Sequence, residues 1–254
     1  MRKSVVFVLV LILALYVPAN LSAEEDVKGL PPDQLAKYCD SFDKLREDLW
    51  EKTHLVDTGK QQANFLAGDI SIVNGRVRFE TRPGGFSKAG FGSKFWLKGD
   101  FDIQIDCDFS FSKEKADMDQ RIMFIVQEKG KHFRDADFSI LHFVKRPGES
   151  GSMRLGCQAY FRFAWAGERE VEGFHGTLRL VRTGKTTQAL YRKSGEEEWN
   201  KLGSCYGSSK DMMLGFTLQN FLWDRNSIKA EIPLSATFDN FKINAAQGIE
   251  ESPI

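Results

Sequence analysis

The sequence predicts an all-β fold, an antiparallel two-sheet β-sandwich preceded by a short N-terminal segment that is helical or irregular. Three observations predict it: apolar and polar residues alternate with a period of two from about residue 66 onwards, short turn signals separate the alternating runs, and the chain has 21 Phe against 7 Pro. A period of two places apolar side chains on one face of a strand, whereas a helix would spread them around its circumference. Phe also favours the half-buried surface of a sheet.

Residues 1–23 have the layout of a cleaved secretory signal peptide. Arg2 and Lys3 precede an apolar run over residues 5–17, and small residues follow, so we expect cleavage after Ala23. An uncleaved anchor is the alternative, but about 20 apolar residues are needed to span a bilayer and this run is shorter. We therefore expect a secreted or periplasmic protein with no stable membrane span after cleavage.

Residues 24–60 form a polar N-terminal segment. Pro31, Pro32 and Asp33 can open a helix over residues 34–51, where apolar residues recur every three or four positions. A first strand near residues 39–42 is the alternative.

Two long alternating runs define the expected sandwich domain at residues 61–245. Every odd position over residues 101–111 is apolar, and the same alternation runs from Met153 to Trp165. Each run predicts one strand with a single buried face.

Shorter strands should fill the rest of this domain. They are expected over residues 68–73, 75–81, 91–97, 121–128, 137–145, 177–183, 187–193, 212–221, 226–232 and 235–243. Turn signals such as Asn74-Gly75 and Lys98-Gly99-Asp100 separate them without an intervening helical period. This order favours antiparallel meanders packed as two sheets of jelly-roll type, followed by a flexible tail at residues 246–254.

The charge balance excludes a polyanion-binding surface. Lys and Arg total 35, as do Asp and Glu, and removal of Arg2 and Lys3 leaves 33 basic against 35 acidic residues, a net charge of −2. Nucleic-acid binding by counterion release needs an excess of clustered Lys and Arg. We expect no nucleic-acid partner.

Four segments, in their order along the chain, carry a resemblance to a known superfamily. They cover residues 75–79 (GRVRF), 93–103 (SKFWLKGDFDI), 178–199 and 236–243 (ATFDNFKI). Together they resemble the concanavalin A-like lectin/glucanase superfamily over roughly residues 39–244, in particular its secreted bacterial sandwich domains. The resemblance implies a curved jelly roll that frequently presents one sheet to carbohydrate. Lectins, hydrolases, lyases and structural modules share this fold, so it implies no single function.

The acidic residues do not form the catalytic run that the resemblance implies for glucanases, an alternating Glu-x-Asp-x-x-Glu strand. Asp102, Asp106 and Asp108 alternate on one face and superficially suit paired carboxylates. Gln104 and Ser110 continue the same polar pattern, so we interpret this face as a solvated one.

A lyase-like set is the second catalytic hypothesis. His142, Tyr160 and Arg162 are weak catalytic candidates, because Tyr or His can move the proton alpha to a uronate carboxylate that Arg neutralises. His142 lies between Ile140 and Val144, so a buried, hydrogen-bonded histidine is the alternative.

Polar and aromatic residues make the ligand-binding candidates, because sugar rings stack on Trp and Tyr. For Trp96 and Trp199 we favour core or turn packing. The ligand-binding candidates are Gln127, Gln158, Tyr160, Arg162, Trp165, Gln219 and Trp223.

No cofactor is required by the sequence, but structural calcium is possible. Asp40, Asp43 and Asp239 would be available if the first and last strands pair.

The four cysteines of the mature chain permit two disulfides in an oxidising compartment. Cys107 with Cys157 and Cys39 with Cys205 are possible pairs, and two buried thiols at Cys107 and Cys157 are the alternative.

The functional expectation is a secreted, non-catalytic β-sandwich that binds a carbohydrate or another extracytoplasmic ligand, with a glycan or cell-surface ligand as partner. The alternative is a polysaccharide lyase or glycoside hydrolase of an unrecognised family. An assembly or surface-layer component is a third hypothesis.

Overall fold

The computed structural model describes residues 29–52, 65–112, 119–131, 135–221 and 231–251. The expected signal peptide, Trp223 and most of the strand expected at residues 226–232 lie outside these ranges. Among the residues described, no helix combines the length and apolarity needed to cross a membrane.

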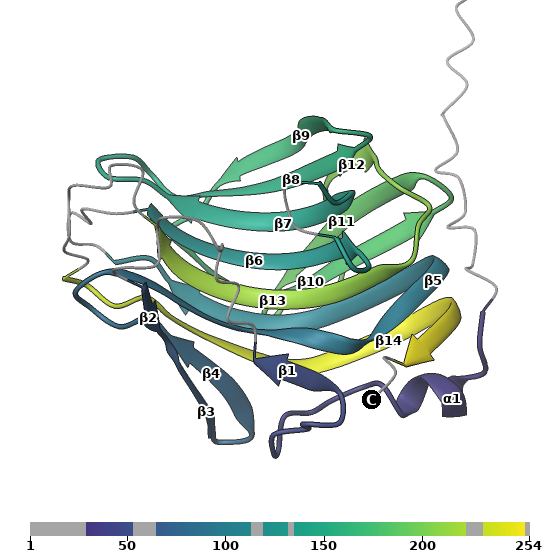
Figure 1. The fold of residues 1–254 in the computed structure, drawn as a ribbon. Coiled ribbons are helices and arrows are strands. Elements are labelled where there is room, and N and C mark those ends of the chain that lie inside the picture. The colour runs from purple at the N-terminus through teal and green to yellow at the C-terminus, as the bar shows by residue number, and fades with distance from the viewer. Residues whose placement is uncertain (1–28, 53–64, 113–118, 132–134, 222–230, 252–254) are drawn as a thin grey trace, which may run out of the picture.

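The chain is built almost entirely of strands (Figure 1). The elements are α1 (Pro32–Ala36), β1 (Trp50–Lys52), β2 (Phe65–Ala67), β3 (Asp69–Val73), β4 (Arg76–Glu80), β5 (Phe86–Ser110), β6 (Asp119–Glu128), β7 (Phe138–Lys145), β8 (Ser152–Ala159), β9 (Arg162–Glu170), β10 (Gly173–Thr183), β11 (Thr186–Lys193), β12 (Asn200–Tyr206), β13 (Met212–Phe221) and β14 (Ser235–Glu251).

The strands form two layers that share β5. Its first half pairs with β1, β2 and β13, and the order continues from β13 through β6, β7 and β8 to β9; we call this the first sheet. Its second half pairs with β10 and β14, and the order runs from β12 through β11, β10, β5, β14 and β4 to β3; we call this the second sheet. In Figure 1, β10, β11 and β12 lie behind the bowed strands of the first sheet. The predicted antiparallel sandwich is confirmed.

One expected turn is wrong. Residues 98–100 do not end a strand, because β5 continues for 25 residues from Phe86 to Ser110. Gly99 takes a φ of +59°, and the register with β14 shifts nearby, between Ala246 and Gly248. A glycine with bulges beside it bends the strand without breaking its pairing, so the turn-like tripeptide marks the passage from one sheet to the other.

The alternation from Met153 to Trp165 belongs to two strands, not one. Tyr160 and Phe161 have φ angles of +51° and +62° and form the two-residue turn between β8 and β9. A two-residue hairpin reverses the parity of the chain, so Trp165 faces the same side as Gly156 and opposite to Leu155. Composition alone does not reveal this reversal, because neither turn residue is a typical turn former.

The N-terminal helix is much shorter than expected. It ends at Ala36, and a bridge between Asp40 and Phe241 joins the following segment to β14. The carboxylate of Asp40 accepts hydrogen bonds from Phe42 N (2.8 Å) and Trp50 Nε1 (2.7 Å), which fix an irregular backbone where a helix was expected.

The C-terminal region is a strand where a tail was expected. β14 extends to Glu251 and pairs with β5 through Gly248 and Ile249. Glu250 also forms ion pairs with Lys98 (2.6 Å) and Lys129 (3.1 Å), which hold the end of the strand.

Phenylalanine fills the interior, as its abundance predicts. Trp50 lies among the rings of Phe216 and Phe241, with centroid distances of 5.1 and 5.2 Å and nearly perpendicular planes. Phe79 packs on Phe91 and Phe216 in the same cluster. These aromatic contacts join the N-terminal segment to both sheets.

Arg182 on β10 is a fully buried arginine. Its guanidinium donates hydrogen bonds to the carbonyl oxygens of Gly99 (2.9 Å) and Lys210 (2.7 Å) and lies 4.5 Å from the ring centroid of Phe101. Burial lowers its pKa to about 10, and a guanidinium with that pKa stays charged at neutral pH.

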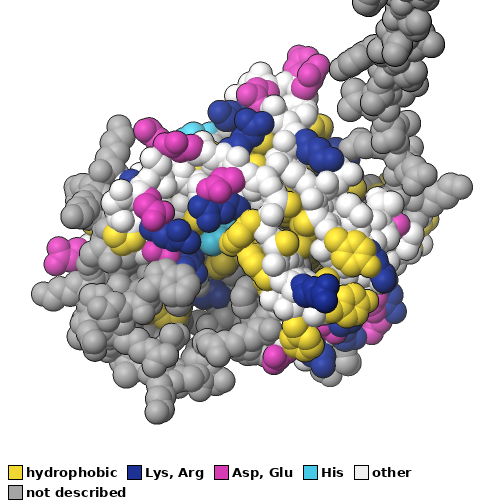
Figure 2. Space-filling view, turned by 90° about the horizontal axis from the view of Figure 1, so that it is seen from above, with side chains coloured by type: hydrophobic (Ala, Val, Ile, Leu, Met, Phe, Trp, Pro, Cys, Tyr) yellow, Lys and Arg dark blue, Asp and Glu magenta, His cyan; other side chains and the backbone are white. Residues whose placement is uncertain are grey.

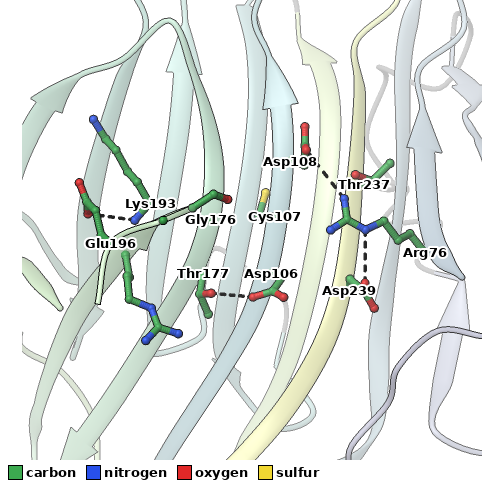
Figure 3. A pocket seen from close by; sticks show the side chains of 13 residues that line it. Arg76, Asp106, Cys107, Asp108, Gly176, Thr177, Lys193, Glu196, Thr237 and Asp239 are labelled. Atoms are coloured by element: carbon green, nitrogen blue, oxygen red, sulfur yellow. Dashed lines mark hydrogen bonds and ion pairs between the residues drawn. The ribbon is translucent and has the colours of Figure 1, made fainter. Parts of the chain in front are cut away.

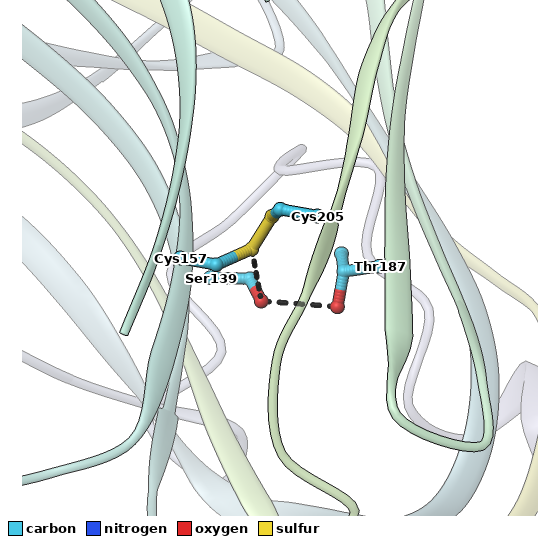
Figure 4. Close-up of a disulfide and its surroundings, with 4 residues drawn as sticks. All are labelled: Ser139, Cys157, Thr187 and Cys205. Carbon is cyan, nitrogen blue, oxygen red and sulfur yellow. Dashed lines mark hydrogen bonds between the residues drawn. A yellow bond between two sulfur atoms is a disulfide. The ribbon is translucent and has the colours of Figure 1, made fainter. Parts of the chain in front are cut away.

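A disulfide joins Cys157 of β8 to Cys205 of β12, with the Cα atoms 6.1 Å apart (Figure 4). The expected pairs Cys107–Cys157 and Cys39–Cys205 are therefore wrong, and Cys39 and Cys107 are free. Cys107 lies opposite Gly176 and Phe238 in the middle of the second sheet. Strand parity finds buried cysteines but not which strands face each other across the interior.

Candidate ligand-binding surface

The outer face of the first sheet carries an exposed aromatic cluster. Side chains at Ile122, Phe124 and Val126 of β6 point to the core, so the alternate positions face outwards. Figure 2 shows hydrophobic side chains gathered on this side of the molecule. Among the described residues, its exposed aromatic side chains are Tyr160, Phe161, Phe163 and Trp165. Tyr206 is also exposed but ends β12 of the second sheet.

Trp165 is the centre of this surface. Its indole stacks on the His142 imidazole at 5.8 Å and 17°, and Phe163 meets it edge-on at 4.8 Å. Gly156, opposite Trp165 in the register, leaves room for the ring, because a Cβ there would lie 2.8 Å from the indole. The guanidinium of Arg154 lies 5.7 Å from the indole centroid. We call Trp165, Phe163, His142 and Arg154 the aromatic platform.

The platform leaves nearly half of Trp165 accessible, at 46% exposure. His142 and Phe163 hold the indole in place, so little conformational entropy is lost when a ligand stacks on it. A fixed, half-exposed indole is suited to the apolar C–H face of a sugar ring.

His142 is a buried, neutral member of the platform. Burial, together with the charges of Arg121, Arg154 and Arg146, lowers the pKa of His142 to about 3. Within the described part of the chain, its Nε2 has no hydrogen-bond partner. Its role here is to support the indole.

The three weak catalytic candidates do not come together. His142 faces outwards opposite Arg154, whereas Tyr160 lies six residues further along the β8 direction, about 20 Å away for an extended strand. Arg162 lies opposite Ala159, whose side chain points to the core side. The lyase-like arrangement that the sequence suggested is therefore not formed.

The ligand-binding candidates fall into two groups. Gln127, Gln158, Trp165 and Gln219 share the outer face of the first sheet. Two of the glutamines are used locally, since Gln127 donates to Lys131 O (2.8 Å) and Gln158 to Ala136 O (2.9 Å). Tyr160 and Arg162 lie instead at the β8–β9 hairpin.

The hairpin keeps two aromatic residues in an unfavourable backbone conformation. Tyr160 is 60% and Phe161 78% exposed, and both have positive φ, which non-glycine residues seldom adopt. The turn is held by Asp137, whose carboxylate accepts from Tyr160 N at 2.8 Å and pairs with Lys210 at 3.1 Å. Burial pushes the pKa of Asp137 up, but these partners outweigh it and the net pKa lies below its usual value.

The opposite face of the molecule, on the second sheet, has a pocket of about 190 Å³ (Figure 3). Several of its polar side chains contact one another: Arg76 pairs with Asp239 (3.3 Å) and Asp108 (3.8 Å), and Thr177 donates to Asp106 (2.6 Å). Beyond the pocket, Asp102 pairs with Arg179 at 2.5 Å. Asp106 and Asp108 are partly exposed, but Asp102 is only 7% exposed, so the interpretation of this acidic face as a solvated one is wrong at Asp102.

The calcium candidates are each engaged by other groups. Asp40 binds Trp50, Asp43 accepts from Ser41 Oγ (2.7 Å), and Asp239 binds Arg76. Over the described ranges, no group of three or more His, Cys, Asp and Glu residues is placed to hold a metal ion.

Sequence reasoning missed several residues of the outer face, Phe163, Arg154 and Lys88 among them. Phe163 was assigned to the core face because the hairpin reversal is silent in the alternation. Lys88 is 6% exposed although it faces outwards, and a single lysine in a strand gives no sign of such burial.

Comparisons with known proteins match this architecture but no sequence family. No family model and no curated protein matches the chain. A Bacillus licheniformis β-glucanase is 12% identical with a TM-score of 0.58, over 81% of this chain and 96% of that one. LamAcat from Zobellia galactanivorans is 9% identical with a TM-score of 0.57, over 81% and 96%. The CBM2 module of an evolved Dit protein of Lactobacillus casei BL23 phage J-1 is 9% identical with a TM-score of 0.54, over 82% and 95%.

These similarities establish the fold. The chain has a concanavalin A-like jelly-roll fold, as the sequence resemblance implied. At these sequence identities the shared fold does not define a function, so the function is argued from the chain's own residues.

Proposed function

We propose that this protein is a secreted, non-catalytic module that binds a glycan on the outer face of its first sheet. The observation that carries the proposal is the stacking of the half-exposed Trp165 on His142. Similar solved structures include a β-glucanase and a CBM2 module, which supports a carbohydrate ligand on this fold.

Two carboxylates of this face are engaged by arginines, which favours binding over hydrolysis. A glycoside hydrolase commonly needs two carboxyl groups about 5 to 9.5 Å apart, one of which must act as an acid. On the outer face, Glu168 pairs with Arg154 (2.6 Å) and Asp119 pairs with Arg121 (2.7 Å). These two carboxylates neutralise arginines.

A glycan array probed with the wild-type protein and with Trp165→Ala tests the proposal. We expect wild-type binding to a defined set of glycans and a roughly tenfold or greater loss of affinity in the variant, equivalent to about 1.4 kcal/mol. Trp199→Ala is the matched control, because that indole lies near Arg179 and Arg192, on strands of the second sheet.

Absence of any glycan binding by the folded wild-type protein would overturn the proposal. If Trp165→Ala leaves glycan binding unchanged, the aromatic platform is not the binding site.

A further inference from the structure

The outer face of the first sheet also contains a buried amine. Lys88 of β5 is only 6% exposed, and no hydrogen bond or ion pair to another described residue satisfies its ammonium group. Its neighbours in sequence show that it points outwards, since Ala89 and Phe91 face the core. Burial lowers its pKa to about 7.

The residue opposite Lys88 is also polar and buried. Gln219 of β13 pairs with Lys88 in the register and is 9% exposed. Its side-chain amide makes no hydrogen bond to the described residues. Directly opposed side chains of an antiparallel pair have Cβ atoms about 5 Å apart, so Lys88 and Gln219 start side by side on this face.

The next strand adds a guanidinium to the same row. Arg121 of β6 lies opposite Gln219, and its side chain pairs with Asp119 at 2.7 Å. Lys88, Gln219 and Arg121 therefore follow one another across three adjacent strands, about 5 Å apart per strand. The row carries two basic groups and one acidic group.

An unpaired buried ammonium is costly. A buried polar group without a partner costs about 1 to 3 kcal/mol, and a charged one costs more. An incoming anion would remove this cost, because it would supply the partner that no described residue provides. The amide of Gln219 could then bind a neighbouring hydroxyl group.

We infer that Lys88 and Gln219 form a subsite for the acidic substituent, a carboxylate or a sulfate, of an anionic glycan. The inference rests on the proposed glycan binding and specifies its ligand class. The net charge of the chain is near zero, so the subsite recognises a local acidic group and not a polyanion in general.

The subsite and the aromatic platform lie at two ends of the same sheet face. Trp165 is on β9 and Lys88 on β5, five strand spacings apart, and their rows differ by four residues along the strands. These spacings correspond to about 27 Å. A ligand that contacts both is therefore an oligosaccharide, and its acidic unit lies several sugars away from the stacked one.

Calorimetric titration with matched oligosaccharides tests the inference. The probes are an oligogalacturonate, a sulfated oligosaccharide, a neutral oligosaccharide of equal length, and free sulfate. We expect at least one acidic oligosaccharide to bind about tenfold or more tightly than the neutral one, with free sulfate binding much more weakly. The carboxylate and sulfate arms identify the acidic group.

Lys88→Met should remove this preference and leave the affinity for the neutral probe within about twofold. Lys94→Met is the matched control on the same strand and face, because Lys94 is exposed and donates to Glu47 O (2.7 Å). Lys88→Gln serves as a second variant if the first fails to fold by thermal melting.

Equal affinity for acidic and neutral probes would overturn the anionic subsite while leaving glycan binding intact. The same holds if Lys88→Met and Lys88→Gln keep the acidic preference. If Trp165→Ala weakens binding of the neutral probe and the Lys88 variants change nothing, only the subsite fails. If no oligosaccharide binds, both proposals fail.

Discussion

The imidazole of His142 lies beneath the indole of Trp165 with the two ring planes only 17° apart. The contact crosses β8, whose Gly156 has no side chain to separate the rings. The histidine is buried and the tryptophan half exposed, so one ring supports the surface that the other presents.

Acid should weaken the fold through His142. Its pKa is about 3 in the folded protein against 6.5 normally, so between these values the unfolded chain binds more protons. The free energy of unfolding therefore falls as the pH decreases from about 6.5 towards 3, by at most about 1.4 kcal/mol per pH unit from this group. Urea unfolding of the wild type and His142→Phe at pH 7, 5 and 4 measures this pH dependence of the free energy of unfolding.

The stability difference between His142→Phe and the wild type should grow in favour of the variant as the pH falls. His175→Asn, at an exposed histidine, is the control and should follow the wild type more closely. A constant difference across the pH range would contradict this role of His142.

Loss of the Cys157–Cys205 disulfide should destabilise the protein substantially. The two cysteines are separated by 48 residues, and a loop of this size corresponds to about 4 kcal/mol in the chain-entropy model. Denaturant unfolding of Cys205→Ser should show a loss of about 2 to 5 kcal/mol. Cys39→Ser, at a free cysteine, should cost much less, and a reducing agent should destabilise the wild type but not Cys205→Ser.

Replacing the strained hairpin turn should stabilise the fold. Tyr160→Asn with Phe161→Gly supplies residues that accept positive φ, so we expect the free energy of unfolding to rise by about 1 kcal/mol. Thermal melting with a parallel denaturant titration measures the change. Tyr206→Asn, at an exposed aromatic residue with ordinary backbone angles, should give no such gain; an unstable double variant would show that the two rings pack more favourably than their exposure indicates.

Arg182 should be essential for stability. Arg182→Met leaves the carbonyl groups of Gly99 and Lys210 without a buried donor and removes the contact with Phe101. We expect a loss of about 3 to 5 kcal/mol. Arg192 lies on the neighbouring strand β11, close to Trp199, and is more exposed than Arg182. Arg192→Met should cost under about 1 kcal/mol in the same denaturant assay.

Strand identity was readable from the sequence because the period of two is a local property. The run at residues 101–111 becomes the second half of β5 with its odd positions buried, as predicted. The hairpin at Tyr160 and Phe161 was not readable, because its turn depends on Asp137, which is 23 residues away along the chain. The disulfide was missed for the same reason: it depends on how two sheets stack.

The candidate surface was predicted in part. Trp165 and Gln219 were chosen as aromatic and polar ligand-binding candidates, and both lie on the outer face. Lys88 was not chosen, because its unusual property is a burial that only the assembled sheet creates. His142 was a catalytic candidate with a buried, hydrogen-bonded histidine as the alternative. It is buried, but stacking on Trp165 takes the place of the expected hydrogen bond.

The strand from Phe86 to Ser110 belongs to both layers. Neither layer can detach without pulling apart a backbone segment that the other one also hydrogen-bonds. The jelly roll should therefore melt as one cooperative unit. Folding should be limited by the pairing of this shared strand with strands from both halves of the chain.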